Sequence, residues 1–175
     1  LKNLMTVDTV TTKAGMDFYD GTLEGRSIVV VRCGIGKVNA GMCVQILIDL
    51  FGVTHIINTG VAGSLNPKLD IGDILISESA LQHDMDSSPI GFAPGQIPDI
   101  DVLAFPADRA MVHTAVAACR RVNPDIHVLT GLVVTGDQFI SSRDAKERLV
   151  SVFHGDCAEM EGGAVAQVSY LNRLP

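Results

Sequence analysis

Apolar and polar residues follow two different periods along this chain, and the change of period separates expected strands from expected helices. Residues 6–13 alternate polar with β-branched side chains and residues 16–23 continue towards a turn, which predicts a pair of antiparallel strands. Residues 27–33 form a nearly continuous apolar run, which predicts a strand buried on both faces. Residues 38–51 repeat apolar side chains at helical spacing, and Gly52 is expected to end that helix.

Strands and helices are expected to alternate through the rest of the chain. The expected strands are residues 55–58, 72–77 and 127–135, and the expected helices are residues 107–121, 142–153 and 162–172. A polar, proline-bearing segment at 82–105 is long enough to indicate a functional loop or an interface element. This order predicts an α/β fold with three α/β/α layers around a central mixed β-sheet.

The composition is that of one globular domain without a nucleic-acid or membrane partner. With 175 residues, 47% of them hydrophobic, the chain can bury a sizeable core, so residues 1–175 are expected to form a single domain. The net charge of −7, without any basic run, argues against a nucleic-acid partner. The longest apolar runs are too short to span a bilayer and no basic-then-apolar leader is present, so a cytoplasmic location is expected.

Cysteine and histidine spacing gives no metal or redox motif. The four cysteines, Cys33, Cys43, Cys119 and Cys157, include no C-x-x-C pair, which indicates buried thiols in a reducing compartment. Segment 83–86 places an imidazole beside two carboxylates, but no further clear ligand group accompanies them. We interpret it as a polar loop or an interface, and expect no metal there.

Three turns that follow apolar strands offer groups for a ligand, and together they outline a pocket for a nucleoside. The turn at 58–63 has glycines that allow close backbone approach and amides that could bind a base or a water. In the turn at 135–140, Phe139 either stacks on a flat heterocycle or is a core aromatic residue. The third turn, at 157–164, carries carboxylates.

Two acids of the third turn, Glu159 and Glu161, stand on either side of Met160. Acids at a helix N-terminus are favoured by the helix dipole, which accounts for one of them. The second acid, followed by small residues at 162–164, favours a closely approaching ligand. A carboxylate that accepts hydrogen bonds from two vicinal ribose hydroxyls would stabilise an oxocarbenium-like transition state.

A further turn, at 33–38, carries glycines and a lysine between an expected strand and an expected helix. It does not match a phosphate-binding loop, because Val31 and Val38 stand where that motif needs Gly and Ser or Thr. It does not match the dinucleotide motif either, because Asn39 replaces the third glycine. The turn either brings backbone and Ile35 close to a ligand or is purely structural.

In these motifs the chain resembles the 5′-methylthioadenosine/S-adenosylhomocysteine nucleosidases of the nucleoside phosphorylase superfamily. The shared motifs fall in the family's order and approximate spacing over nearly the whole chain, at residues 34–38, 57–63, 71–74, 83–84, 95–98, 136–140 and 159–161. The resemblance implies a nucleoside phosphorylase-like fold and hydrolysis of the adenine N9 to ribose C1′ bond in both nucleosides, in methionine salvage. It implies no metal and no cofactor.

The resemblance also implies roles for individual residues. Glu161 matches the catalytic acid that binds the ribose hydroxyls, Met160 matches the residue packed against the sugar, and Glu159 belongs to the same substrate-binding motif. The other expected binding residues are Ile35 near the 5′ substituent, Val61, Ala62 and Gly63 after the apolar strand, Phe139 and Ile140 around the adenine, and Ile90 and Pro98 of a neighbouring subunit. A homodimer that binds a small adenine nucleoside is therefore implied.

Two departures from the family bear on the mechanism. Val61 stands where some relatives have a serine that helps to hold the nucleophilic water, and it offers only its backbone amide. The family's water-activating glutamate and base-protonating aspartate lie on strands without a counterpart in this chain, which opens on Leu1 and stops at Pro175. We therefore expect a fragment that lacks an N-terminal strand and a C-terminal strand and helix, and that is inactive alone.

Three alternative functions stay open. Phosphorolysis needs a cationic pocket, and Asn58 and Val61 stand where phosphorylase relatives place arginine and serine, although Arg32 or Lys37 could supply charge. Hydrolysis of another purine nucleoside, such as futalosine, is possible because the base-reading aspartate lies outside the chain. A non-catalytic nucleoside-binding protein is the alternative of another class, suggested by the missing acids.

Overall fold

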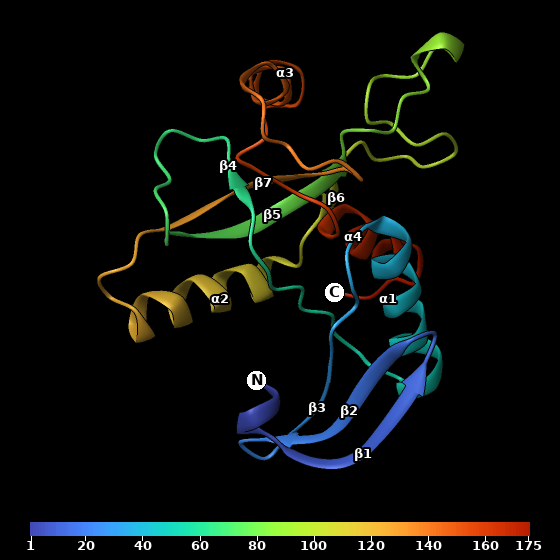
Figure 1. Ribbon diagram of the computed structural model, residues 1–175, viewed down its shortest axis with the longest axis vertical. Helices are drawn as coiled ribbons and strands as arrows, with labels where there is room; N and C mark the ends of the chain where they lie inside the picture. The colour runs from blue at the N-terminus through green and yellow to red at the C-terminus, as the bar shows by residue number, and fades with distance from the viewer.

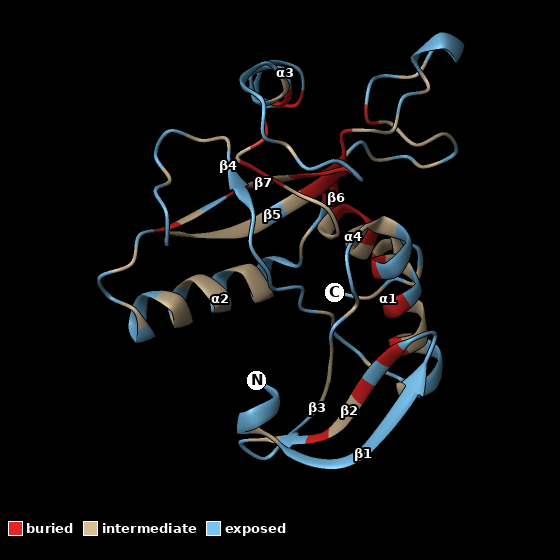
Figure 2. Cartoon of the chain, viewed as in Figure 1, coloured by how far each residue is buried: buried red, intermediate tan, exposed pale blue.

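A small antiparallel sheet is built by the first three strands of the computed structural model, which describes residues 1–175. After a short 3-10 helix at Lys2–Leu4, the strands β1 (Thr6–Lys13), β2 (Met16–Leu23) and β3 (Arg26–Val31) pair in sequence order (Figure 1). The expected antiparallel pair is therefore confirmed. Every residue of β1 is exposed, whereas β2 buries Met16 and Phe18 against the rest of the chain (Figure 2).

The expectation that the apolar run at 27–33 is buried on both faces is wrong. In β3 the last four residues are only half-buried and none is fully buried. β3 is one of the two edge strands of the small sheet: Val29 and Val31 pack against the core formed with the first long helix, and the run also lines an open cavity. A continuous apolar run thus marks a strand with one packed face here.

The larger sheet has five strands in the order β4-β8-β7-β5-β6 and is mixed, as predicted. Its central strands run parallel, and two short edge strands run antiparallel to their neighbours. The parallel strands are β5 (Ile74–Gln82), β7 (Val128–Thr135) and β8 (Cys157–Glu159), and the edge strands are β4 (Gly63–Ser64) and β6 (Phe105–Pro106). The carboxyl ends of the parallel strands therefore meet at one edge of the sheet.

Four helices complete the α/β/α layers. Helix α1 (Lys37–Phe51) packs on the small sheet and on α4 (Gly162–Leu171), while α2 (Arg109–Val122) and α3 (Arg143–Phe153) lie on opposite faces of the larger sheet (Figure 1). Gly52 ends α1 in the left-handed conformation, as expected. Both α2 and α3 begin at a residue whose side chain accepts from an amide of the first turn, Asp108 and Ser142 respectively.

The strand expected at 55–58 does not form. Residues 53–62 are irregular, and between residues 55 and 58 the one backbone hydrogen bond runs from Ile56 N to Pro175 O, at 2.8 Å. A strand needs a neighbour along most of its length to satisfy its amides and carbonyls, and no strand of the structure pairs with this segment. The apolar pattern at 55–58 therefore belongs to an irregular, unpaired segment.

The cysteines are all free, and two of the four are buried. Cys43 and Cys157 lie in the core, whereas Cys33 and Cys119 are half-buried, so the expectation of buried thiols holds for two of them. Burial raises the pKa of Cys43 to about 11 and that of Cys157 to about 12, which keeps both thiols protonated at neutral pH. None of the helices is long and apolar enough to cross a membrane; the cytoplasmic location stays a prediction.

The core under α3 gives a test of the fold. Phe153 packs with Leu81, Leu149 and Val134, so Phe153→Ala is expected to lower the free energy of unfolding by about 3–5 kcal/mol. The neighbouring exposed Val152→Ala should change it by about 0.5 kcal/mol or less. Urea denaturation followed by circular dichroism measures both, and equal losses for the two variants would contradict this placement of α3.

Candidate active site

The turn between β8 and α4 is held from inside by Glu159. One oxygen of its carboxylate, Oε2, accepts from Glu161 N at 2.8 Å and from Gly162 N at 2.6 Å, and Oε1 accepts from the Thr135 hydroxyl. Thr135 Oγ1 in turn accepts from Gly163 N at 2.6 Å. These bonds satisfy the otherwise unpaired amides at the start of α4 and place a negative charge there. Glu159 therefore stabilises the turn, and both of its carboxylate oxygens are engaged by the protein.

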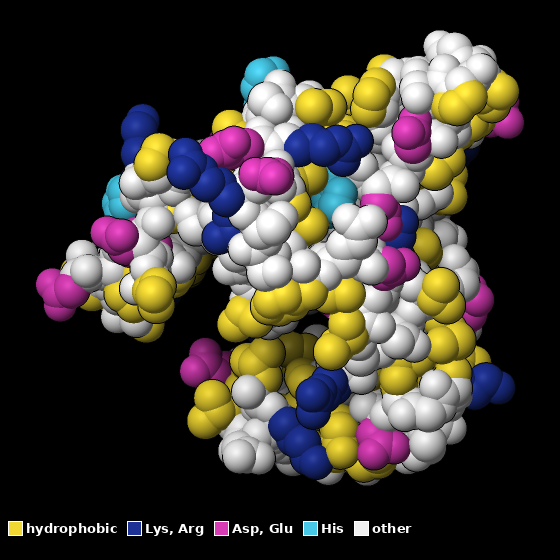
Figure 3. Space-filling model, turned by 45° about the horizontal axis from the view of Figure 1, so that its top comes forward, with side chains coloured by type: hydrophobic (Ala, Val, Ile, Leu, Met, Phe, Trp, Pro, Cys, Tyr) yellow, Lys and Arg dark blue, Asp and Glu magenta, His cyan; other side chains and the backbone are white.

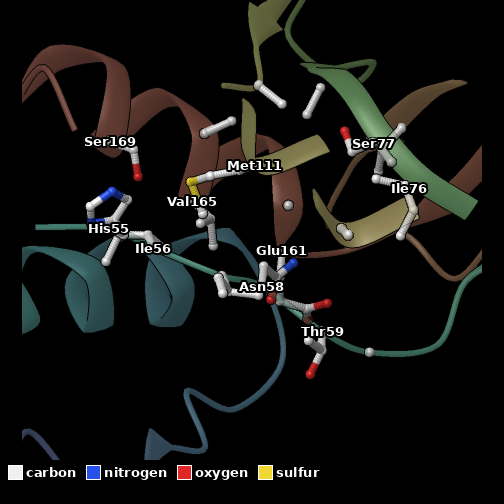
Figure 4. Close-up of a pocket in the computed structure, with 18 of the residues that line it drawn as sticks. His55, Ile56, Asn58, Thr59, Ile76, Ser77, Met111, Glu161, Val165 and Ser169 are labelled. Atoms are coloured by element: carbon white, nitrogen blue, oxygen red, sulfur yellow. The ribbon is translucent and has the colours of Figure 1, made fainter. Parts of the chain in front are cut away.

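The second acid of the motif, Glu161, points into an open space. Its Oε1 accepts from Gly36 N at 2.7 Å, while Oε2 accepts no hydrogen bond from the chain. The half-buried side chain lies beside Asn58 and Thr59 of the irregular segment (Figure 4). The motif thus divides into one acid that holds the turn and one acid that is presented to a ligand.

The turn at 33–38 is tied to the same sheet edge by charge. Lys37 Nζ donates to Asp84 Oδ1 at 2.7 Å and to Gln82 Oε1 at 3.2 Å, and Lys37 N donates to Asp137 Oδ1 at 2.8 Å. Burial raises the pKa of Asp84, but the hydrogen bonds from Lys37 and Asp137 and the positive charge of Lys37 outweigh it, so this pKa lies below its ordinary value. Asp84 therefore stays ionised at neutral pH.

Glu161 lines a large cavity of about 3080 Å³ between the small sheet and the larger one. Apolar side chains such as Ile76, Met111 and Val165 form much of its wall (Figure 4), and apolar atoms border the hollow in Figure 3. Typical small-molecule pockets have roughly 300–1,000 Å³, so a ligand of nucleoside size would fill only part of this cavity.

Several of the expected binding residues line this cavity. They are Ile35, Val61, Ala62, Glu159 and Glu161. Met160 is half-buried in the turn that joins the two acids. Gly63 pairs with Ala158 of β8, which places the segment before it against the turn of Glu159. The structure therefore brings together two turns that are almost a hundred residues apart in the sequence.

Other expected binding residues do not line the cavity. Phe139 has 87% of its surface exposed, so the alternative of a core aromatic residue is wrong, and stacking on a base stays a prediction. Ile140 packs against the core under α3. Ile90, in the 3-10 helix Ser88–Ile90, and Pro98 lie on the loop that projects from the sheet edge (Figure 1).

The segment with a metal-like sequence has other partners. The ring of His83 is buried, and its Nε2 has no hydrogen-bond partner, while Asp84 binds Lys37. Burial is the main cause of a lowered pKa of His83, which favours its neutral form. No group of three or more His, Cys, Asp or Glu side chains is placed to hold a metal ion.

Comparison with known proteins agrees with this arrangement. A family model described as the phosphorylase superfamily matches residues 2–175. The chain belongs to this superfamily. One relative, the 5′-methylthioadenosine/S-adenosylhomocysteine nucleosidase of Anoxybacillus flavithermus, is 39% identical over 169 residues, which cover 95% of this chain and 72% of the relative. The nucleoside phosphorylase-like fold is confirmed.

Solved structures extend the comparison. The nucleosidase of Colwellia psychrerythraea, in complex with adenine, matches 99% of this chain and 72% of its own with a TM-score of 0.94 and 35% identity. The futalosine hydrolase of Helicobacter pylori matches 99% of this chain and 74% of its own with a TM-score of 0.93 and 32% identity. Both hydrolases therefore share the architecture that positions Glu161.

The role of Glu159 as an internal cap gives a stability test. Removing its carboxylate leaves two amides and a hydroxyl without an acceptor, so Glu159→Ala is expected to lower the free energy of unfolding by about 1–3 kcal/mol. Glu147→Ala, which removes an exposed carboxylate from α3, should cost about 1 kcal/mol or less. Urea denaturation compares them, and an equally small effect of both variants would refute the capping role.

Proposed function

We propose that this protein is an N-glycosyl hydrolase that releases adenine from 5′-methylthioadenosine and S-adenosylhomocysteine and leaves a 5-thioribose product. The observation that carries the proposal is the carboxylate of Glu161, which is fixed by Gly36 N on one oxygen and open to the cavity on the other. The similarity to nucleosidases supports the same reaction. These substrates would place the enzyme in methionine salvage, a cytoplasmic process.

In the proposed reaction Glu161 is the catalytic residue. It accepts hydrogen bonds from the 2′ and 3′ hydroxyls, and these bonds strengthen as positive charge grows on the sugar ring. The N9 to C1′ bond breaks with its electron pair moving to adenine, a water oxygen bonds to C1′, and the proton that this water gives up balances the proton that the departing adenine takes up. Met160 packs against the sugar, Ile35 lies near the 5′ substituent, Phe139 and Ile140 contact the base, and the segment 61–63 offers backbone amides.

Water is favoured over phosphate as the nucleophile. The ammonium of Lys37 is already paired with Asp84 and bonded to Gln82, so it is committed within the protein. Asn58 and Val61 line the cavity with a neutral amide and an apolar side chain. Arg32 is exposed and also lines the cavity, and its guanidinium group could bind phosphate. Phosphorolysis is therefore the alternative reaction that an assay must distinguish from hydrolysis.

A product assay tests the proposed reaction. We expect adenine and 5-methylthioribose from 5′-methylthioadenosine, at a rate that added phosphate does not change. Formation of a ribose 1-phosphate analogue would show phosphorolysis instead, and binding of the nucleoside without turnover would show the non-catalytic alternative.

The matched variant for this assay is Glu161→Gln, which keeps the size of the side chain but removes its charge. We expect kcat to fall by roughly 100- to 1,000-fold, because the stabilisation of the developing cation is lost. Binding of adenine should change little. An undiminished kcat in this variant would rule out the role of Glu161.

Futalosine hydrolysis is a second candidate, favoured by the close structural match to a futalosine hydrolase. Both reactions break a bond between a purine N9 and ribose C1′, so Glu161 would serve either. The large cavity does not discriminate between 5′ substituents by its volume. Side-by-side values of kcat/KM for 5′-methylthioadenosine, S-adenosylhomocysteine and futalosine decide between them.

A homodimer is part of the proposal, because Ile90 and Pro98 do not line the cavity of their own chain. Ile90 has 73% of its surface exposed, as expected of a residue that closes over the alkylthio group of a neighbouring subunit. Sedimentation should give the mass of a dimer. Ile90→Asp is expected to raise KM for 5′-methylthioadenosine; a monomeric mass with normal KM would refute this arrangement.

A further inference from the structure

Three charged residues form a closed ring of hydrogen bonds next to the candidate active site. Lys37 begins α1, Asp84 follows the end of β5, and Asp137 follows the end of β7. Lys37 Nζ donates to Asp84 Oδ1 at 2.7 Å, Asp137 N donates to Asp84 Oδ2 at 2.9 Å, and Lys37 N donates to Asp137 Oδ1 at 2.8 Å. The ring therefore ties together three segments that are distant in the sequence.

Two residues of this ring, Lys37 and Asp137, are close in the sequence to residues that contact Glu161 or take part in the proposed reaction. Gly36, next to Lys37, donates to Glu161 Oε1 at 2.7 Å. Asp137 lies two residues before Phe139, the expected partner of the base. None of the three ring residues lines the cavity, and neither do Gly36 and Phe139, so the ring is connected to the cavity through Glu161.

The turn at Gly36 depends on close packing with the ring. Gly36 has φ 94°, and a Cβ there would lie 3.0 Å from Asp137 Oδ1. Glycine is the one residue that takes this conformation without strain and leaves room for the carboxylate. Asp137 also accepts from Lys37 N at 2.8 Å, so it holds the residue that follows the amide in contact with Glu161.

The ion pair in the ring is more sheltered than an ordinary surface pair. The side chains of Lys37 and Asp84 are 21% and 16% exposed, compared with 89% and 62% for Arg143 and Glu147 on α3. Lys37 Nζ also donates to Gln82, whose amide donates to Gln167 of α4 at 2.6 Å. Partial burial strengthens such bonds, and the network reaches the helix that Glu161 precedes.

We propose that Lys37, Asp84 and Asp137 are positioning residues, whose ring fixes the carboxylate of Glu161 relative to the Phe139 segment so that sugar and base are held at once. The proposal rests on the proposed function, since it names the geometry that this reaction needs. A displacement of about 1 Å in such a constellation costs roughly 100-fold in rate. The ring thus contributes to kcat without touching the substrate.

Substitutions in the ring test this role by activity. Asp84→Asn and Lys37→Met are each expected to lower kcat by roughly 10- to 100-fold with a smaller change in KM. The double variant should be little worse than either single variant, because the two single variants and the double variant all remove the same interaction between residues 37 and 84. In the double variant, in addition, neither side chain of the pair is left as an unpaired charge. Glu147→Gln, which breaks the exposed pair on α3, is the matched control and should leave kcat unchanged.

A pH profile separates positioning from a merely structural role. The ammonium of Lys37 favours the ionised form of Asp84, so in Lys37→Met this carboxyl should take up its proton at a higher pH than in the parent protein. The acid limb of kcat should then move to higher pH in Lys37→Met and not in the double variant. An unmoved limb, with kcat within twofold of the parent in both single variants, would overturn the proposal.

Hydrogen exchange gives a readout that does not need turnover. In Asp84→Asn the amides of Gly36, Lys37 and Asp137 should exchange at least tenfold faster than in the parent, while amides of α3 stay unchanged. If the parent protein releases no adenine, the proposed function fails, and this exchange result still decides whether the ring holds Gly36 at Glu161. Unchanged exchange at all three amides would show that the ring does not hold the turn.

Discussion

Parallel pairing of β5, β7 and β8 is the constraint on which the rest of the site depends. Because the three strands run in one direction, their carboxyl ends deliver Asp84, Asp137 and Glu159 to the same edge of the sheet. Helix α1 begins at that edge as well: the amide of Lys37 donates to Asp137, and the amide of Gly36 donates to Glu161, two residues after Glu159. The carboxylates of the site come from separate segments, and the sheet topology brings these segments to one edge.

Local sequence patterns were sufficient for most elements of the fold but not for their neighbours. The helix α1, its end at Gly52 and the parallel strand β7 agree with hydrophobic period and turn chemistry, which act over a few residues. The segment at 55–58 has the composition of a strand, yet pairing is a property of the neighbour, and here only Ile56 finds one bond. Burial also depends on neighbouring segments, so the apolar run of β3 does not indicate whether one or both faces of the strand are covered.

The candidate site could be located from the sequence, whereas the division of labour within it could not. In the sequence, Glu159 and Glu161 are the same residue type on either side of Met160. In the structure, Glu159 accepts from amides at the start of α4, whereas Glu161 accepts from the amide of Gly36. The bonds from Lys37 to Asp84 and Asp137 join residues 47 and 100 positions apart, and no periodicity reports such contacts. The motif at 83–84 was visible in the sequence, but its partner was not.

The hydrogen bond from Gly36 to Glu161 has a stereochemical consequence. With one oxygen anchored, the carboxylate has little freedom to rotate about its last carbon–carbon bond, so its plane is set before any ligand arrives. Two hydroxyls on the same side of a furanose ring can then share this group, while a sugar with hydroxyls on opposite sides can present only one of them. Selection of ribose over its epimers would thus begin with a backbone amide of a glycine.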